Sequence, residues 1–268
     1  MIGFSGGLRS PPILRGVTAL QALAVLAAGT GAGIVNTVVG SGTLITFPVL
    51  LLVGYSPFTA NVSNSLGLVP GSLSGAYGYH RELTGQRSRI VRFGIASALG
   101  AGSGAALLLI LPPSAFAAIV PFFIALALVL VVLQPRLNRW LARRRGEDRH
   151  PDGGATTLAL DYGCAVYGGY FGAAQGILML ALFGTALDDD LQRVNALKNV
   201  LAAIVNFTAA VVFLIVAHLA WAAVGLLAVG SALGGQIGAR AGRRLAPPAL
   251  RAAIVAIGLV AIAKLVLD

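Results

Sequence analysis

Charge is scarce in this sequence. Only 10% of the residues are Asp, Glu, Lys or Arg, whereas a soluble domain carries about 25%. No charged residue occurs in 16–80, 93–135 or 199–239. Each interval is long enough for one or two segments of about 20 apolar residues, the length that crosses a bilayer core of about 30 Å. Because these segments have no charged face, the sequence excludes a soluble domain and predicts an all-α, polytopic integral membrane protein.

Cysteine and the common catalytic motifs are also nearly absent. The single cysteine, Cys164, cannot form an intramolecular disulfide. The sequence contains no His-Glu-x-x-His, Gly-x-Ser-x-Gly or Walker motif, so it indicates neither an enzyme nor an ATP-driven pump, and no metal or cofactor is expected. An intramembrane enzyme would depend on Asp161 and Asp188, and neither belongs to a recognisable motif. Residues 1–15 lack a short apolar core with a cleavage site, so no cleaved signal peptide is predicted.

Basic residues, in contrast, are plentiful, and the formal net charge is +10. Fourteen of the nineteen lie in 81–92, 136–149 and 240–251. Basic clusters beside apolar spans are typical of cytoplasmic loops and contact anionic lipid head groups. We therefore expect the loops 80–92, 136–156 and 240–251 on the cytoplasmic side of the inner (plasma) membrane, with lipids and not nucleic acid beside them.

The two halves of the chain are related by a constant offset of 134 residues. The sequence SALG at 97–100 recurs at 231–234, and the same offset pairs Asn61 with Asn195. Loops that correspond under this offset differ in charge, since one of each pair is basic and the other contains no Lys or Arg. Corresponding loops therefore lie on opposite sides of the membrane. This pattern predicts an inverted-topology repeat, a recurrent plan of secondary transporters.

The repeat divides the chain into three parts. The first membrane repeat is 1–135, the basic cytoplasmic linker is 136–156, and the second membrane repeat is 157–268. Each repeat is expected to contain a re-entrant or broken helix pair followed by three transmembrane helices.

The re-entrant pair is predicted from segment length and glycine content. The apolar segment 157–187 is too long for one plain span and is interrupted by glycines, with its turn expected near 173–176. By symmetry, 17–53 is expected to turn near 40–42. This arrangement places the N-terminus outside, whereas an extra crossing within 17–39 would reverse it.

Each predicted break frees backbone N–H and C=O groups, which lipid cannot satisfy, so it must be buried in protein or line a hydrated cavity. The half-helices that start after Gly42 and Gly176 would direct N–H groups and positive dipole ends at that cavity, which suits an anion. The alternative is that the small residues only allow close helix packing. The candidate binding residues at the breaks are Asn36, Gly40, Ser41, Gly42, Thr43, Gln175 and Gly176.

A polar face follows each break on the next helix. Its members are spaced at i, i+3 and i+4, so they share one side of a helix. They are Asn61, Asn64 and Ser65 in the first half and Asn195, Lys198 and Asn199 in the second. A cation within an apolar run is costly and indicates a function, here the neutralisation of an anionic substrate. Alternatively, Lys198 extends to the surface or pairs with an aspartate at 188–190.

Two further groups of residues also have alternative interpretations. The aspartates at 188–190 with Arg193 indicate the start of a helix, because acids stabilise the positive end of its dipole, and a cation site is the less favoured interpretation. Tyr77 and Tyr79 are either interface anchors or cavity lining, and the sequence does not distinguish these roles.

These motifs resemble the sulfite exporter TauE/SafE family, also called four-toluene sulfonate uptake permeases. The resemblance is carried by GIVNTVVGSGTLITFPVLLLVGYSPFTANVSNSLG at 33–67 and by a weaker second copy, GGYFGAAQGILMLALFG at 168–184 with VNALKNVLAAIVNF at 194–207. It covers essentially the whole chain and implies an inner-membrane carrier of sulfite, sulfonates or other small sulfur-containing anions. The second copy departs from the first where Leu182 replaces Pro48, so the two halves of the site need not be mirror images.

The sequence therefore predicts a secondary transporter that moves a small anionic substrate by alternating access. A proton gradient, a sodium gradient or the anion's own gradient would drive it. The alternatives are an anion channel and a carrier for a small organic solute without sulfur.

Overall fold

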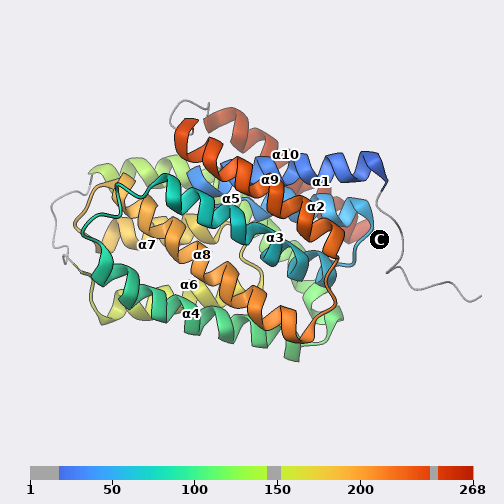
Figure 1. Cartoon of the computed structure of the whole chain (residues 1–268), viewed down its shortest axis with the longest axis horizontal. Helices are drawn as coiled ribbons and strands as arrows, with labels where there is room; N and C mark the ends of the chain where they lie inside the picture. Colours follow the sequence, from blue (N-terminus) through green and yellow to red (C-terminus); the bar gives the residue numbers. More distant parts are fainter. Residues whose placement is uncertain (1–17, 144–151, 242–246, 268) are drawn as a thin grey trace, which may run out of the picture.

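The computed structural model describes residues 18–143, 152–241 and 247–267, and the regular structure within them is α-helical (Figure 1). Residues 144–151 and 242–246, which belong to two of the predicted cytoplasmic loops, lie outside the described residues, as does the N-terminal segment 1–17. The helices are α1 (Ala19–Val38), α2 (Thr43–Val53), α3 (Pro57–Gly78), α4 (Arg87–Ile110), α5 (Pro113–Arg143), α6 (Ala155–Tyr170), α7 (Gln175–Ala186), α8 (Leu191–Val216), α9 (Trp221–Ala241) and α10 (Pro247–Leu267).

Five of the described helices are long and apolar enough to cross a membrane, namely α1, α4, α5, α8 and α9. The shorter apolar helices include α2 and α7, which follow the two breaks. The prediction of an all-α, multi-pass membrane protein is confirmed.

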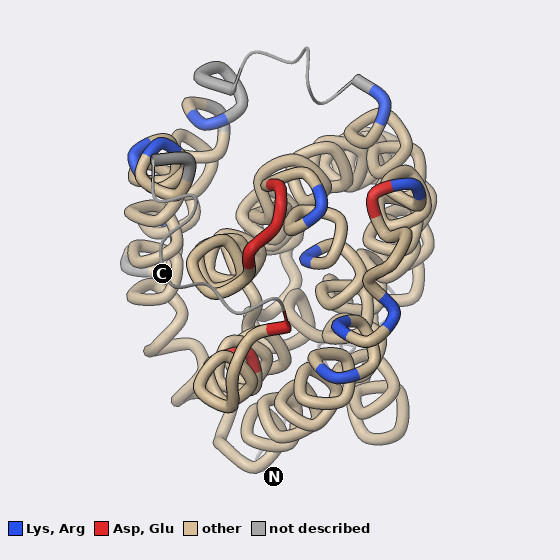
Figure 2. Tube along the Cα trace, turned by 90° about the vertical axis from the view of Figure 1, so that its left-hand side faces the viewer, with Lys and Arg blue, Asp and Glu red and all other residues tan. Residues whose placement is uncertain are grey.

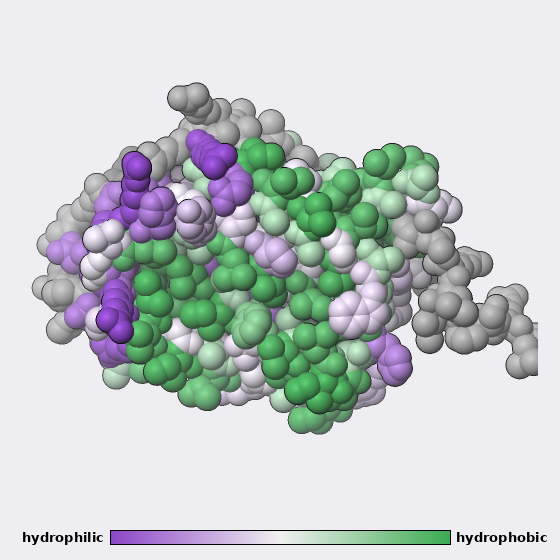
Figure 3. Space-filling view, viewed as in Figure 1, coloured by the Kyte–Doolittle hydropathy of each residue, from purple (hydrophilic) through white to green (hydrophobic). Residues whose placement is uncertain are grey.

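Charged residues gather at one end of this bundle. Arg89, near the start of α4, lies 3.5 Å from the Asp152 carboxylate and also pairs with Asp189, so the α5–α6 and α7–α8 connections both meet the start of α4 there. Figure 2 looks onto this charged end, and Figure 3 shows it as hydrophilic, whereas hydrophobic side chains cover the middle of the molecule. The described parts of the loops 80–92 and 136–156 therefore share one end, and its cytoplasmic location stays a prediction.

Helix starts follow ordinary capping chemistry. Thr18 caps α1 in a reciprocal capping box with Gln21. Ser56 caps α3, with Pro57 in the first helical position, where a missing N–H costs nothing. Asp190 caps α8 through its side chain, so the interpretation of 188–190 as a helix start is confirmed.

Both predicted helix breaks are present. The first separates α1 from α2 at 39–42, and the second separates α6 from α7 at 171–174. Gly40 and Gly172 adopt positive φ values of 87° and 75°, a region that favours glycine because it has no Cβ. The Gln21 side chain donates to the Val53 carbonyl at 3.4 Å, which brings the start of α1 to the end of α2. The first pair is thus a hairpin that returns to its own end of the bundle (Figure 1).

The two halves interlock. α1 lies along α9 and α4 lies along α6, while α3 packs against α9 as its equivalent α8 packs against α4. These contacts correspond to one another when the halves are exchanged, since α6 and α9 are the equivalents of α1 and α4. This arrangement is the one expected of a repeat, and its inverted sense and the division at 136–156 stay predictions.

The two breaks meet each other inside the bundle. The Gly176 N–H donates a hydrogen bond to the Gly40 carbonyl at 3.1 Å. A Cβ added to either glycine would lie 2.5 Å from the Cα of the other, which is closer than any side chain tolerates. The positions where sequence predicted the turns are therefore in direct backbone contact, although 136 residues, the difference between 176 and 40, separate them.

We predict that Gly176→Ala lowers the free energy of unfolding by about 1–3 kcal/mol, because the added methyl group forces the two breaks apart. Thermal unfolding in detergent measures this change. Gly163→Ala in α6 is the matched control, since a Cβ there meets nothing within 4 Å. A Gly176→Ala protein that melts together with the Gly163→Ala protein would contradict the contact between the breaks.

Candidate functional site

A buried ammonium group lies against the end of α1. Lys198 on α8 is 1% exposed, and its Nζ donates to the Asn36 carbonyl at 3.1 Å and to the Thr37 carbonyl at 3.5 Å. The last carbonyls of a helix lack partners within it and form the negative end of its dipole, so a cation there is stabilised. Within the described residues, Lys198 neither extends to the surface nor pairs with a carboxylate, so both of the alternatives drawn from its position were wrong.

The other two members of this polar face reach the same carbonyl. The side-chain amides of Asn195 and Asn199 donate to the Thr37 oxygen at 3.4 Å and 3.3 Å. Three side chains from one face of α8 therefore converge on the end of α1, as their i, i+3, i+4 spacing allows. The predicted face exists, and its partners are backbone oxygens.

The equivalent face in the first half behaves differently. Asn61 on α3 donates to the Tyr170 carbonyl at 2.9 Å, so it caps α6 across the repeat as Asn195 caps α1. Asn64, the equivalent of Lys198, instead bonds to the Thr43 hydroxyl at 3.3 Å and to the Thr46 hydroxyl, both on α2. One half therefore uses a neutral amide and the other adds a charge.

The remaining candidates form local contacts around the breaks. Asn36 donates to the Ser72 hydroxyl at 3.3 Å, and Ser65 donates to the Asn61 carbonyl of its own helix at 3.1 Å. Gln175 is buried and its amide contacts the Met179 sulfur at 3.8 Å.

Ser41 and Gly42 occupy the first break itself. The Ser41 hydroxyl is buried and makes no hydrogen bond with the described residues. The Gly42 carbonyl accepts from Ile45 at 2.9 Å, which begins α2. At the second break, the N–H of Gly176 that was expected to face a ligand is instead used by Gly40.

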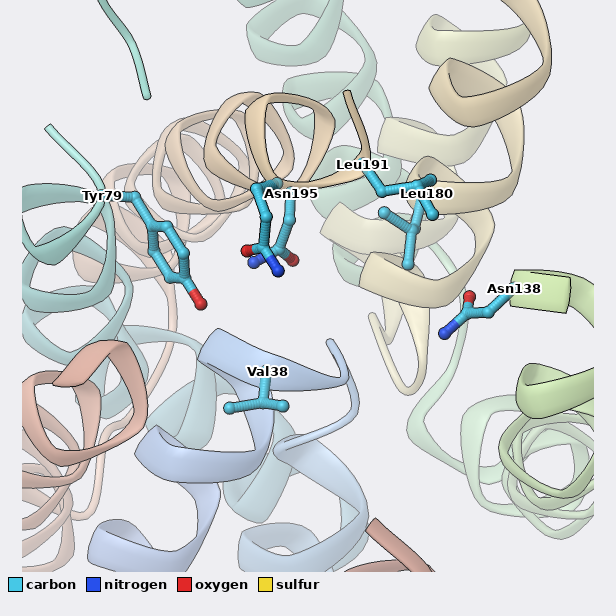
Figure 4. Close-up of a pocket in the computed structure, with 7 residues that line it drawn as sticks. Val38, Tyr79, Asn138, Leu180, Leu191 and Asn195 are labelled. Atoms are coloured by element: carbon cyan, nitrogen blue, oxygen red, sulfur yellow. The ribbon is translucent and has the colours of Figure 1, made fainter. Parts of the chain in front are cut away.

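The side chains of α3 and α8 that contact the two breaks form a polar layer. A pocket of about 200 Å³ lies beside this polar layer at the charged end. Its lining residues are Val38, Tyr79, Asn138, Leu180, Leu191, Gln192 and Asn195. Figure 4 shows the Tyr79 hydroxyl and the Asn138 and Asn195 amides directed into it. Gln192 is exposed, whereas Asn195 is 8% exposed, so the pocket extends from the surface to the polar layer.

The pocket contains three polar residues outside the predicted site. Tyr79 was one of two tyrosines for which cavity lining was an alternative, and the structure assigns this role to it, while Tyr77 is 71% exposed. Gln192 and Asn138 were not predicted. Gln192 lies one helical turn before Asn195, so the i, i+3 spacing of the polar face could have identified it. Asn138 lies in a basic segment that gave no such signal.

The corresponding region of the other half is filled by aromatic rings. The Phe47 and Phe171 rings lie 5.2 Å apart in an edge arrangement, and Phe116 packs against Tyr170 at 5.7 Å. Tyr170 is the residue whose carbonyl Asn61 caps, and the Asn61 Oδ1 is buried without a partner in the described part of the chain. A pocket is thus present on one side of the breaks and ring packing on the other.

A helical membrane bundle in which two broken-helix pairs meet beside a pocket is typical of membrane transporters. Residues 25–265 match the family described as Sulfite exporter TauE/SafE, and the chain belongs to that family. The resemblance inferred from the sequence is confirmed.

Curated relatives carry corresponding names. The chain is 28% identical over 263 residues to the Escherichia coli (strain K12) protein named "Probable membrane transporter protein YfcA", covering 96% of this chain and 91% of that one. It is 28% identical over 211 residues to "Probable membrane transporter protein ORF9" of Sinorhizobium sp, covering 78% of each chain. A Haemophilus influenzae "Probable membrane transporter protein" is 26% identical over 256 residues, covering 93% of this chain and 96% of that one. No solved structure gives a significant match.

The ion pairs at the charged end generate a prediction about pH. Burial alone would raise the pKa of Asp189, but hydrogen bonds from Arg89 and the Asp190 backbone, with the charges of Arg193 and Arg89, lower that pKa overall. A carboxyl whose pKa is lower in the folded chain stabilises that chain above its unfolded pKa of about 4, and the contribution is lost as the pH falls through the folded pKa.

We therefore expect Asp189→Asn to lower the free energy of unfolding by about 1–3 kcal/mol at pH 7 and to have little effect once the pH falls well below 4. Thermal unfolding of wild type and variant from pH 7 to pH 3 measures the difference. Asp188→Asn is the control, because Asp188 is exposed and makes no ion pair with the described residues. Equal stability of Asp189→Asn and wild type at pH 7 would contradict the account.

Proposed function

We propose that this protein is a secondary transporter that moves a small sulfur-containing anion, such as sulfite or a sulfonate, across the bacterial inner membrane by alternating access. The observation that carries the proposal is the buried ammonium of Lys198 beside the pocket, without a carboxylate partner in the described residues. The candidate site is the polar layer at the two breaks together with the pocket that reaches it.

The charge of Lys198 supports an anionic substrate. Lys198 lies one helical turn after Asn195, which lines the pocket, and no Asp or Glu is among the lining residues. A charge in a medium of low dielectric constant acts more strongly and over a longer range than in water. We expect this charge to favour an anion at the inner end of the pocket, where the anion would neutralise the fixed cation.

The polar lining supports a substrate with several oxygen acceptors. Within the described residues, the amides of Asn138 and Gln192 make no side-chain hydrogen bond, and Asn195 uses one of its two N–H groups. These groups can donate to the oxygens of a sulfite or sulfonate. The pocket volume of about 200 Å³ is smaller than the roughly 300–1,000 Å³ of sites for drug-sized ligands, which fits a substrate of a few heavy atoms.

The difference between the two sides of the breaks supports alternating access. A carrier exposes its site to one side at a time. The pocket lies at the charged end, whereas aromatic rings around Phe171 close the opposite side. If the charged end is cytoplasmic, as its basic loops indicate, the structure is inward-facing. The printed names of the relatives, which describe probable membrane transporters, support the same class.

We expect one sulfur oxyanion, tested beside acetate and phosphate, to raise the melting temperature of the purified protein. Binding at a hundred times the dissociation constant stabilises the folded state by about 2.7 kcal/mol, and each kcal/mol raises the midpoint by about 2–4 °C in a chain of this size. Asn138→Ala and Gln192→Ala should lose the response.

Asn206→Ala is the matched control for this measurement, since the Asn206 amide bonds to Ser72, away from the pocket. Stabilisation by acetate but by no sulfur anion would contradict a sulfur-containing substrate and indicate another class of solute. An anion response that survives unchanged in both pocket variants would show that the site lies elsewhere.

A further inference from the structure

The end of α1 has the donor chemistry of a cation site. Its Asn36 and Thr37 carbonyl oxygens are released by the break after Val38 and face α8. In broken-helix transporters, carbonyls of this kind coordinate the coupling cation. Here the ammonium of Lys198 occupies that position at hydrogen-bond distance.

We propose that the α1 carbonyls form a monovalent-cation site that this protein fills with its own Lys198, so that the tethered ammonium takes the place of a free sodium ion. The inference rests on the proposed transport of an anion, because the tethered charge is what the anion neutralises. Its consequence is a carrier that does not need sodium for binding or movement of its substrate.

The other half of the molecule shows that capping alone does not require this charge. The end of α6 is equivalent to the end of α1, and the neutral amide of Asn61 caps it at 2.9 Å. Among the residues that the structure describes, Asn64, at the position equivalent to Lys198, bonds to two threonine hydroxyls of α2. At the end of α1, the Asn195 and Asn199 amides of α8 already donate to the Thr37 carbonyl. Because a buried charge is costly, its addition to an end that amides already cap indicates a further role.

The site is also within reach of small solutes. The pocket leads from the exposed Gln192 to Asn195, which lies one helical turn before Lys198 and shares the Thr37 carbonyl with it. Lys198→Ala removes three carbons and the ammonium, and these are the heavy atoms of n-propylammonium. The variant therefore leaves a space of matching shape beside the two carbonyls.

The test is chemical rescue of Lys198→Ala. The variant should melt about 5 °C or more below wild type, and n-propylammonium in the millimolar range should restore at least half of that loss. The neutral 1-propanol, which has the same heavy-atom framework, should not. Asn64→Ala is the matched control from the equivalent position, and propylammonium should leave its melting temperature unchanged. Failure of propylammonium to restore Lys198→Ala, or equal restoration by 1-propanol or of Asn64→Ala, overturns the proposal.

A second measurement does not depend on the variant folding. Wild type should melt at the same temperature in sodium chloride and in choline chloride at equal concentration, because its cation site is already filled. Selective stabilisation of wild type by sodium overturns the proposal. Neither readout uses a substrate, so rescue by propylammonium together with no response to any anion would contradict the proposed transport and leave the cation site standing.

Discussion

The hydrogen bond from the Gly176 N–H to the Gly40 carbonyl joins the two interruptions on which the structure depends. A break inside a membrane survives only when other protein groups satisfy the backbone atoms that it releases. Here each half supplies the groups that the other lacks, since Lys198 caps α1 and Asn61 caps α6. The halves therefore stabilise each other at the breaks. The packing of α1 along α9 and of α4 along α6 also joins the two halves.

This constraint also produces the chemistry of the site. Two glycines in contact leave no room for side chains at the meeting point, so polar groups must reach it from α3 and α8. On α8 they include a charge and on α3 they do not, so the two polar faces differ electrostatically. The pocket lies on the side of the charged face, and the aromatic packing lies at the end of α6 that Asn61 caps. The pocket and the aromatic packing thus lie on opposite sides of the two breaks.

The helical membrane fold and both breaks could be predicted, because an apolar segment too long for one span and interrupted by glycine has few other solutions. The contact between Gly40 and Gly176 could not, since sequence gives no distance between residues so far apart. Lys198 was identified as an embedded cation, but its partners are backbone carbonyls, which every residue has and which no side-chain pattern reveals. Asn138 was missed because it lies among arginines in a segment interpreted as a linker, whereas α5 extends through Arg143 and brings it to the pocket.

The measurement that tests the central claim most directly is counterflow of a labelled sulfur anion, sulfite or a sulfonate, into proteoliposomes. A carrier that alternates around one site returns across the membrane faster when it is loaded, so unlabelled anion inside should accelerate the entry of labelled anion outside. The account predicts entry that saturates with concentration and is stimulated by internal anion. Entry that rises linearly with concentration and is indifferent to internal anion would contradict it and identify a channel.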